Sequence, residues 1–291
     1  TLIAPLLALL GLFAGCDGCA TDAAPPAENR TAPPAAFNDD KAVPPDPRES
    51  VLAKSVHSLL ENEHLVHRPA DDAISTEAFK AYLERLDGGK LFLLQADVDA
   101  LARMSHDMDD QLKSGNLLIA RQGEARLIAR RKVVAGVVAE LVQKAFDFDQ
   151  EESVETDPDK TAFCKTEDEL RERWRKELKL QVLQRVGAME SIEEARKKGD
   201  RDDDEDTPAP QEEIPADFKG KEAKARQEVA TSYEARFKRF EDREPLDPAD
   251  RFLGAITSVY DPHTTYLPPA EMENFDIEMS GSLEGIGALL G

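Results

Sequence analysis

Apolar residues recur about every 3.6 positions along most of the chain after residue 50, which is the period of an amphipathic helix. The first helix is expected to bury one apolar side made of Val51, Leu52, Val56, Leu59, Leu60 and Leu65. A second helix is expected to begin with Ser75 as its N-cap and to end at Gly88–Gly89. Its apolar stripe consists of Phe79, Tyr82, Leu83 and Leu86. A third helix carries Val98, Leu101 and Met108.

The same period continues through four further helices. The longest is expected over about 116–146, and a fifth begins near Glu167 and places Trp174 in the core. The sixth spans about 219–242. In the seventh, Asp247–Pro248 predicts the start, because an N-cap acid precedes a proline in the first turn. Its buried face consists of Phe252, Leu253, Ile256 and Tyr260. No strand is predicted before Tyr260, so we expect residues 48–278 to form a helical domain.

The N-terminal stretch TLIAPLLALLGLFAG, residues 1–15, is uncharged and shorter than the roughly 20 apolar residues of a membrane-spanning helix. This length and the small residues at its end are typical of a signal peptide. No Met and no basic segment precede it, so we expect the true start to be missing. The following FAGC resembles the lipobox of bacterial lipoproteins and predicts lipidation of Cys16. The alternative is an ordinary secretory signal with a chance cysteine.

Residues 16–47 are rich in Pro and Ala and predict an extended tether, because such a composition cannot form a packed core. Cys16 and Cys19 have the C-x-x-C spacing of a redox site. Their position directly after an export signal disfavours that function. Cys164 has no evident partner in the sequence, so no disulfide framework is predicted.

The charge of the chain excludes some classes of ligand. A net charge of −22 over 291 residues repels phosphate backbones, so we expect no nucleic-acid binding. The run DRDDDED at 200–206 could suggest calcium, but a Gly at the sixth position and a Glu at the twelfth of an EF-hand loop are missing. We therefore expect a disordered acidic insertion over about 198–216. No metal and no cofactor are predicted.

The end of the chain changes character after Tyr260. Asp261–Pro262 takes the chain out of the helix. His263 lies close to Asp261 and Ser258 in sequence, but proximity in sequence does not make a catalytic triad, and a hydrogen-bonded turn is the favoured interpretation. Residues 270–279 predict a short helix or an extended connector.

The stretch SLEGIGALL, residues 282–290, contains two glycines separated by one apolar residue. Gly285 and Gly287 can let backbone N–H groups converge on a carboxylate, with Ile286 and Ala288 lining the loop. A strand that follows such a loop can pair with a peptide at its edge. The alternative is that the glycines only shape a bend. A phosphate loop is disfavoured, since the third glycine of G-x-G-x-x-G is not at the required spacing.

Three segments together resemble the tail-specific proteases, also called carboxy-terminal processing peptidases. They are ISTEAFKAYLERLDGGKLFLLQADVDAL, YDPHTTYLPP and ENFDIEMSGSLEGIGALL, and the resemblance covers about residues 48–291. It implies a mainly α fold, in which a helical N-terminal domain is followed by the truncated first strand of a PDZ domain at 279–291.

The resemblance also implies a function. Members of this family are exported bacterial serine endopeptidases with a Ser–Lys dyad, in which the Lys acts as general base. The implied partners are protein substrates with apolar free C-termini and an adaptor lipoprotein, and the implied location is the periplasmic side of the cell envelope, with a lipid anchor in a membrane. The Ser and Lys are expected beyond residue 291, so no catalytic residue is assigned in this chain.

Two other functions remain open. The chain could be a non-catalytic, anchored helical scaffold or adaptor lipoprotein. It could also be a helical spacer of the envelope without peptide recognition, although that hypothesis leaves SLEGIGALL unexplained.

Overall fold

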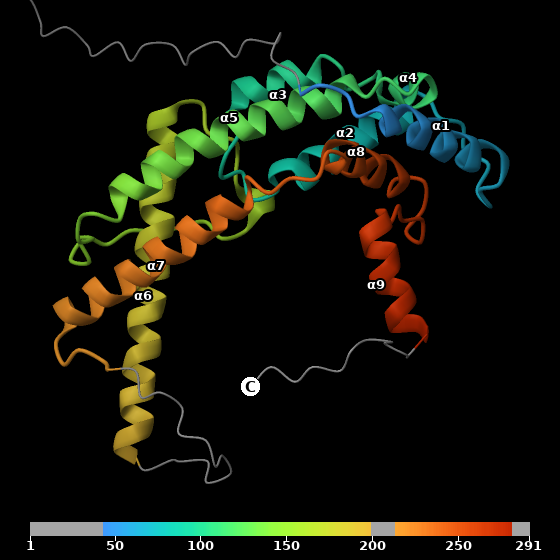
Figure 1. Ribbon diagram of the computed structural model, residues 1–291. Coiled ribbons are helices and arrows are strands. Elements are labelled where there is room, and N and C mark those ends of the chain that lie inside the picture. Colours follow the sequence, from blue (N-terminus) through green and yellow to red (C-terminus); the bar gives the residue numbers. More distant parts are fainter. Residues whose placement is uncertain (1–42, 199–212, 281–291) are drawn as a thin grey trace, which may run out of the picture. The chain divides into compact units, whose positions relative to one another are not determined.

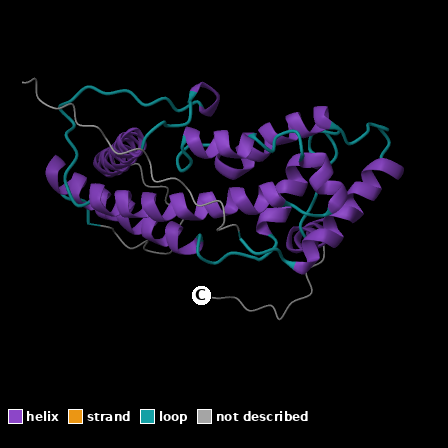
Figure 2. Ribbon diagram, turned by 90° about the horizontal axis from the view of Figure 1, so that it is seen from above, coloured by secondary structure: helices purple, strands orange, loops and turns teal. Residues whose placement is uncertain are grey.

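The computed structural model describes residues 43–198 and 213–280, and within these residues the protein is helical with no strand (Figures 1 and 2). The elements are α1 (Pro47–Asn62), α2 (Asp72–Asp87), α3 (Gln95–Ala102), α4 (Met108–Ser114), α5 (Leu118–Leu141), the 3-10 turn η2 (Pro158–Lys160), α6 (Glu167–Lys198), α7 (Phe218–Arg239), α8 (Asp247–Thr257) and α9 (Pro269–Ser280). The mainly α fold is thereby confirmed. The predicted PDZ strand is not among the described elements: α9 continues through Ser280, and residues 281–291 lie outside the description.

Acidic side chains cap several helices. Asp46 caps α1 in a capping box with Glu49, and Asp217 caps α7. The prediction that Ser75 caps the second helix is wrong, because Asp71 accepts hydrogen bonds from the N–H groups of residues 73 and 74. Ser75 is instead buried in the first turn, where its hydroxyl donates to Asp109 Oδ1 at 2.7 Å. This contact joins α2 to α4.

Other helix boundaries also differ from the sequence-based expectations. The expected third helix is two helices, since tight i to i+3 hydrogen bonds over residues 101–107 end α3 and let Met108 begin α4. The longest helix is α6 with 32 residues, not α5 with 24. Asp247 is the first residue of α8 and not its N-cap, and Tyr260 lies beyond the helix but is buried as predicted. The expected starts near Glu167 and residue 219 hold to within one residue.

The first helix buries less apolar surface than its pattern suggests. Leu60 is buried, and Leu52 and Val56 pack against the core. Val51 and Leu59 are exposed, and Leu65 lies beyond the helix with 93% exposure. The prediction that all six apolar residues face inward is therefore wrong for three of them, because only one narrow side of α1 meets α4 and α8.

Helix α5 contacts both groups of helices that surround it. It packs against α2, α3 and α8 through one part of its surface and against α6 and α7 through another. Figure 1 shows α6 running across α5 and α7. The buried apolar side chains of all these helices form one continuous core. Trp174 is at its centre with 1% exposure, as the sequence predicted, and its indole N–H donates to the carbonyl of Leu91 at 2.6 Å.

None of the helices in the described residues combines the length and hydropathy that a membrane crossing requires.

Candidate functional site

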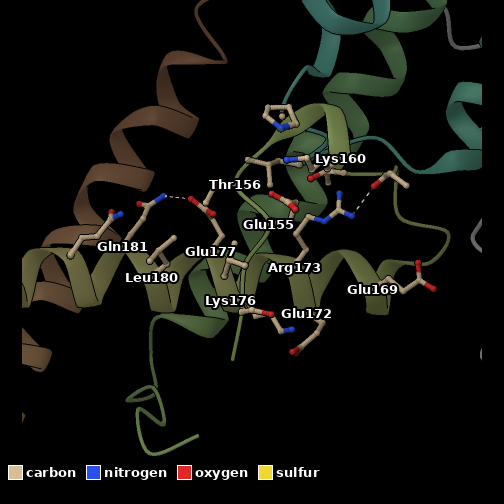
Figure 3. A pocket seen from close by; sticks show the side chains of 18 of the residues that line it. Glu155, Thr156, Lys160, Glu169, Glu172, Arg173, Lys176, Glu177, Leu180 and Gln181 are labelled. Atoms are coloured by element: carbon tan, nitrogen blue, oxygen red, sulfur yellow. Dashed lines mark hydrogen bonds between the residues drawn. The ribbon is translucent and has the colours of Figure 1, made fainter. Parts of the chain in front are cut away.

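A groove of about 1010 Å³ runs along α6, between this helix and the segment 153–162 (Figure 3). Its lining is Gly89, Leu91, Ser153, Val154, Glu155, Thr156, Pro158, Lys160, Thr161, Ala162, Glu169, Glu172, Arg173, Lys176, Glu177, Leu180, Gln181, Gln184, Arg185 and Ala188. Successive turns of α6 form one wall, and an irregular segment forms the other. The groove is therefore long and open, which suits an extended chain better than a compact small molecule.

Two cations hold the irregular wall of the groove in place. Lys90 donates through Nζ to the carbonyl oxygens of Pro158 and Thr161, both at 2.5 Å. Arg173 donates to the carbonyls of Lys90 at 2.6 Å and Ala162 at 2.8 Å. Lys90 itself has a positive φ of 52°, so the turn after α2 adopts a left-handed conformation that aims its side chain at this segment. The wall is fixed by side chain to backbone bonds and not by a regular element.

Glu152 fixes the same segment at its beginning. Its carboxylate accepts from Lys179 Nζ at 2.6 Å and from Arg175, whose Nη1 lies 3.1 Å away. Hydrogen bonds from Arg175 and then from Lys179 lower the pKa of Glu152 to about 2. Lys179 also donates to the carbonyl of Gln150 at 3.0 Å. Both cations lie on α6, so the segment is bound to the helix that it faces.

The groove carries charges of both signs. The acidic lining residues are Glu155, Glu169, Glu172 and Glu177, and the basic ones are Lys160, Arg173, Lys176 and Arg185. In Figure 3, Gln181 donates to Glu177, with 2.8 Å between the atoms, and so supports one wall. Balanced charge does not favour a phosphate chain, which needs an excess of cations. In residues 43–198 and 213–280, no group of His, Cys, Asp or Glu is placed to hold a metal ion.

A second polar cluster lies where the chain leaves α8. Asp261 accepts from the backbone N–H of His263 at 2.6 Å and from the hydroxyl of Thr264 at 2.8 Å. His64, from the segment between α1 and α2, places Nε2 at 2.9 Å from Asp261 and 2.7 Å from Thr264. These bonds, led by that from Thr264, lower the pKa of Asp261. The cluster joins two segments that are far apart in the sequence.

This geometry agrees with a turn at His263 and not with a triad. The His263 side chain is exposed, and the Ser258 hydroxyl donates to the carbonyl of Ala255, not to a histidine. The imidazole that reaches Asp261 belongs to His64, which the sequence analysis missed. No local pattern could have revealed it, because the contact depends on how α1 and α8 pack.

The other predicted site residues fall outside the described residues. They are the lipidation residue Cys16 and the carboxylate loop of Gly285, Ile286, Gly287 and Ala288. Most of the acidic insertion, 199–212, lies outside them as well. Cys164 is a free, buried thiol, and burial raises its pKa, which makes it a poor nucleophile.

Comparison with known proteins identifies the domain. The family described as Tail specific protease N-terminal domain matches residues 56–270. The Tail-specific protease of Haemophilus influenzae is 26% identical over 253 residues, which cover 86% of this chain and 32% of that protein. The chain thus spans about a third of the length of this relative. Since the family match covers α2 to α8 and the last part of α1, the chain belongs to the tail-specific protease family through its N-terminal domain.

Proposed function

We propose that this chain is the N-terminal part of an exported, membrane-anchored serine endopeptidase that recognises proteins by their apolar free C-termini. A PDZ domain that begins near residue 279 captures the C-terminus, and a Ser–Lys dyad beyond residue 291 cleaves the captured protein. The observation that carries this proposal is the family match over residues 56–270. The similarity to a Tail-specific protease over most of the chain supports it.

In this protein the helical domain supports the substrate and does no chemistry. The groove along α6 is long, has charges of both signs and is bordered by an irregular segment with fixed backbone. These properties match an extended polypeptide of mixed sequence, which presents apolar, acidic and basic side chains in turn. We place a stretch of the substrate away from its C-terminus in this groove. The exposed surface of the helical domain offers room for an adaptor lipoprotein.

The activity is tested on the complete gene product. A reporter protein that ends in apolar residues with a free carboxylate should be degraded, and the same protein with a charged tail should persist. A Ser→Ala variant at the predicted dyad should abolish degradation while leaving binding intact. A gene product that binds the reporter without cleaving it, and that has no Ser–Lys pair, would instead support the non-catalytic scaffold.

The groove is tested separately by charge reversal. Lys176 lines the groove, and Gln184 is exposed one helical turn after Leu180, so Lys176→Glu with Gln184→Glu makes the groove strongly acidic. The expected result is a higher KM for acidic reporters with unchanged kcat, since the change affects binding of a remote part of the substrate. Lys197→Glu, on the exposed end of α6 and outside the groove lining, is the control for a charge reversal on the same helix. Equal KM values for the two variants would remove the groove from the proposal.

The anchor is tested by Cys16→Ser. Loss of the thioether lipid should move the protein from the membrane fraction to the soluble periplasmic fraction. Failure of the unchanged chain to take up labelled palmitate would contradict lipidation at this cysteine.

A further inference from the structure

A small pocket with cationic and aromatic walls lies between α5 and the end of α7, apart from the groove. Its volume is about 230 Å³, which is below the roughly 300–1,000 Å³ of sites for drug-sized ligands. The lining residues are Ile128, Arg131, Lys132, Ala135, Phe237, Phe240, Glu241 and Arg243. Three of them carry a positive charge and one carries a negative charge. This excess is notable in a chain whose net charge is −22.

Arg131 is the central cation of this pocket. Its guanidinium carbon lies 4.0 Å from the centre of the Phe240 ring and 5.8 Å from that of Phe92. Its Nε is buried and has no hydrogen-bond partner among the described residues. Burial lowers the pKa of Arg131, because it removes water from the guanidinium charge, and the nearby cations Arg251 and Arg243 lower this pKa further. The two aromatic rings hold the guanidinium plane in a fixed orientation.

The acids near Arg131 are already engaged by other groups. Glu124, which is 1% exposed, binds both Arg243 and Arg251. Asp87 accepts three backbone N–H groups, of residues 91, 92 and 93, at 2.7–3.0 Å. The one acid in the lining, Glu241, is exposed. The cationic side of the pocket therefore has capacity for one more anion.

The remaining walls are apolar. Phe237 and Phe240 pack edge to face, with ring centres 6.0 Å apart and an angle of 72° between the ring planes. Ile128 and Ala135 extend this surface along α5. We propose that the pocket binds a monocarboxylate joined to an apolar group, with the carboxylate at Arg131 and Lys132 and the apolar part against Phe237 and Phe240. A planar carboxylate matches the fork of arginine, whereas a phosphate dianion is repelled more strongly by Glu241.

Two sources can supply this chemistry: the free C-terminal residue of a polypeptide, or a free carboxylic acid. The probes are N-acetylphenylalanine and a hexapeptide that ends in Phe with a free carboxylate. They are titrated into the full chain and followed by calorimetry or by NMR. Binding of both probes assigns the pocket to small acids in general, and binding of the peptide alone assigns it to polypeptide ends. The carboxamide of each probe is expected to bind at least about tenfold more weakly, as loss of a charge-assisted hydrogen bond predicts.

Variants locate the site. Arg131→Gln is expected to weaken binding about tenfold, and rising salt should weaken binding to the unchanged chain. Lys132→Gln changes an exposed side chain that the fold does not require, so it tests the site even if Arg131→Gln lowers stability. Arg239→Gln, on an exposed position of α7 outside the lining, is the matched control and should bind as the unchanged chain does.

Three results would overturn the proposal. They are equal affinity for acid and carboxamide, unchanged binding in both Arg131→Gln and Lys132→Gln, and no binding of either probe up to about 10 mM. The readout is binding and not proteolysis, so the proposal can fail while the proposed protease function stands, and the reverse also holds.

Discussion

At the scale of single residues, Glu124 is a buried acid that faces two arginines. It is 1% exposed on α5, and its two oxygens face Arg243, at 3.5 Å, and Arg251. Glu124→Gln leaves Arg243 and Arg251 without their counter-ion, at a place where the carboxylate is buried from water. We expect the free energy of unfolding to fall by about 1–3 kcal/mol, because Arg243 and Arg251 are 37% and 21% exposed and water compensates part of the lost pairing. Urea denaturation followed by circular dichroism measures this loss.

The control for this prediction is an ion pair on the surface. Glu140 accepts from Arg171 at 2.8 Å, and its side chain is 68% exposed. Glu140→Gln is expected to change the free energy of unfolding by no more than about 1 kcal/mol. Similar losses for the two variants would show that the burial of Glu124 is not what makes its contacts important.

Gly123 is required by close packing of α5 against α2. A Cβ at this position would overlap the hydroxyl of Tyr82, which is fully buried and donates to the carbonyl of Ile119 at 3.3 Å. Gly123→Ala is expected to destabilise the protein by about 1–3 kcal/mol through overpacking, although alanine is the better helix former. Tyr82→Phe removes the overlapping oxygen, so the double variant should cost less than the sum of the single variants. Strict additivity in a denaturation experiment would contradict this explanation.

At the scale of elements, the wall of the groove depends on the ionised state of Glu152. Its pKa is lowered to about 2 in the folded protein from an ordinary value of 4.5, chiefly by Arg175. The stabilisation from a lowered carboxyl pKa is complete above the ordinary value and is lost as the pH falls toward the folded value. Between pH 4.5 and 2 we expect the segment 150–156 to detach from α6.

The NMR chemical shifts of the backbone amides in 150–156 measure this detachment. In the unchanged chain these shifts should move toward random-coil values over this pH range. In Glu152→Gln they should already lie near those values at pH 6 and should change little with pH. A parallel pH dependence in the two proteins would refute the role of Glu152.

Most helices could be predicted from their apolar period, and the failures have identifiable physical causes. The stop at Gly88–Gly89, the start at Glu167 and the burial of Trp174 follow from local signals, and the structure confirms them. The break between α3 and α4 could not be predicted, because Val98, Leu101 and Met108 fit one helical stripe and only tertiary packing separates them. Likewise, the apolar pattern of α1 does not show which of its residues pack against another helix.

At the scale of the whole molecule, the resemblance predicted the family but not the groove. The segment 153–162 has no apolar period that distinguishes it from a linker. Its position depends on Lys90 and Arg173, which both lie outside the segment in the sequence. The cationic pocket likewise combines α5 with the end of α7. Both sites arise from helix packing, so they become visible only in three dimensions.

The cluster of His64, Asp261 and Thr264 determines how firmly the segment after α8 is held to the rest of the domain. Both ring nitrogens of His64 have partners. Nε2 contacts Asp261 and Thr264, and Nδ1 lies 2.9 Å from the carbonyl oxygen of Val66. His64→Ala removes the side-chain contacts with Asp261 and Thr264, whereas Arg68 still donates to the carbonyl of Val259 at 2.9 Å. We expect faster amide exchange in both 64–68 and 261–266, while α5 and α6 remain protected.

His263→Ala is the matched control, because this exposed histidine belongs to the same turn but contributes only its backbone N–H to Asp261. It should leave exchange in both segments unchanged. If His64→Ala affected only 64–68, the turn after α8 would be held by Asp261 and Thr264 alone, and the connection would have no mechanical role. If both segments loosen together, His64 holds the segment after α8 against the segment between α1 and α2. Thr264→Val should then reproduce the effect in part, since it removes one of the two partners of His64 Nε2 but keeps the contact with Asp261.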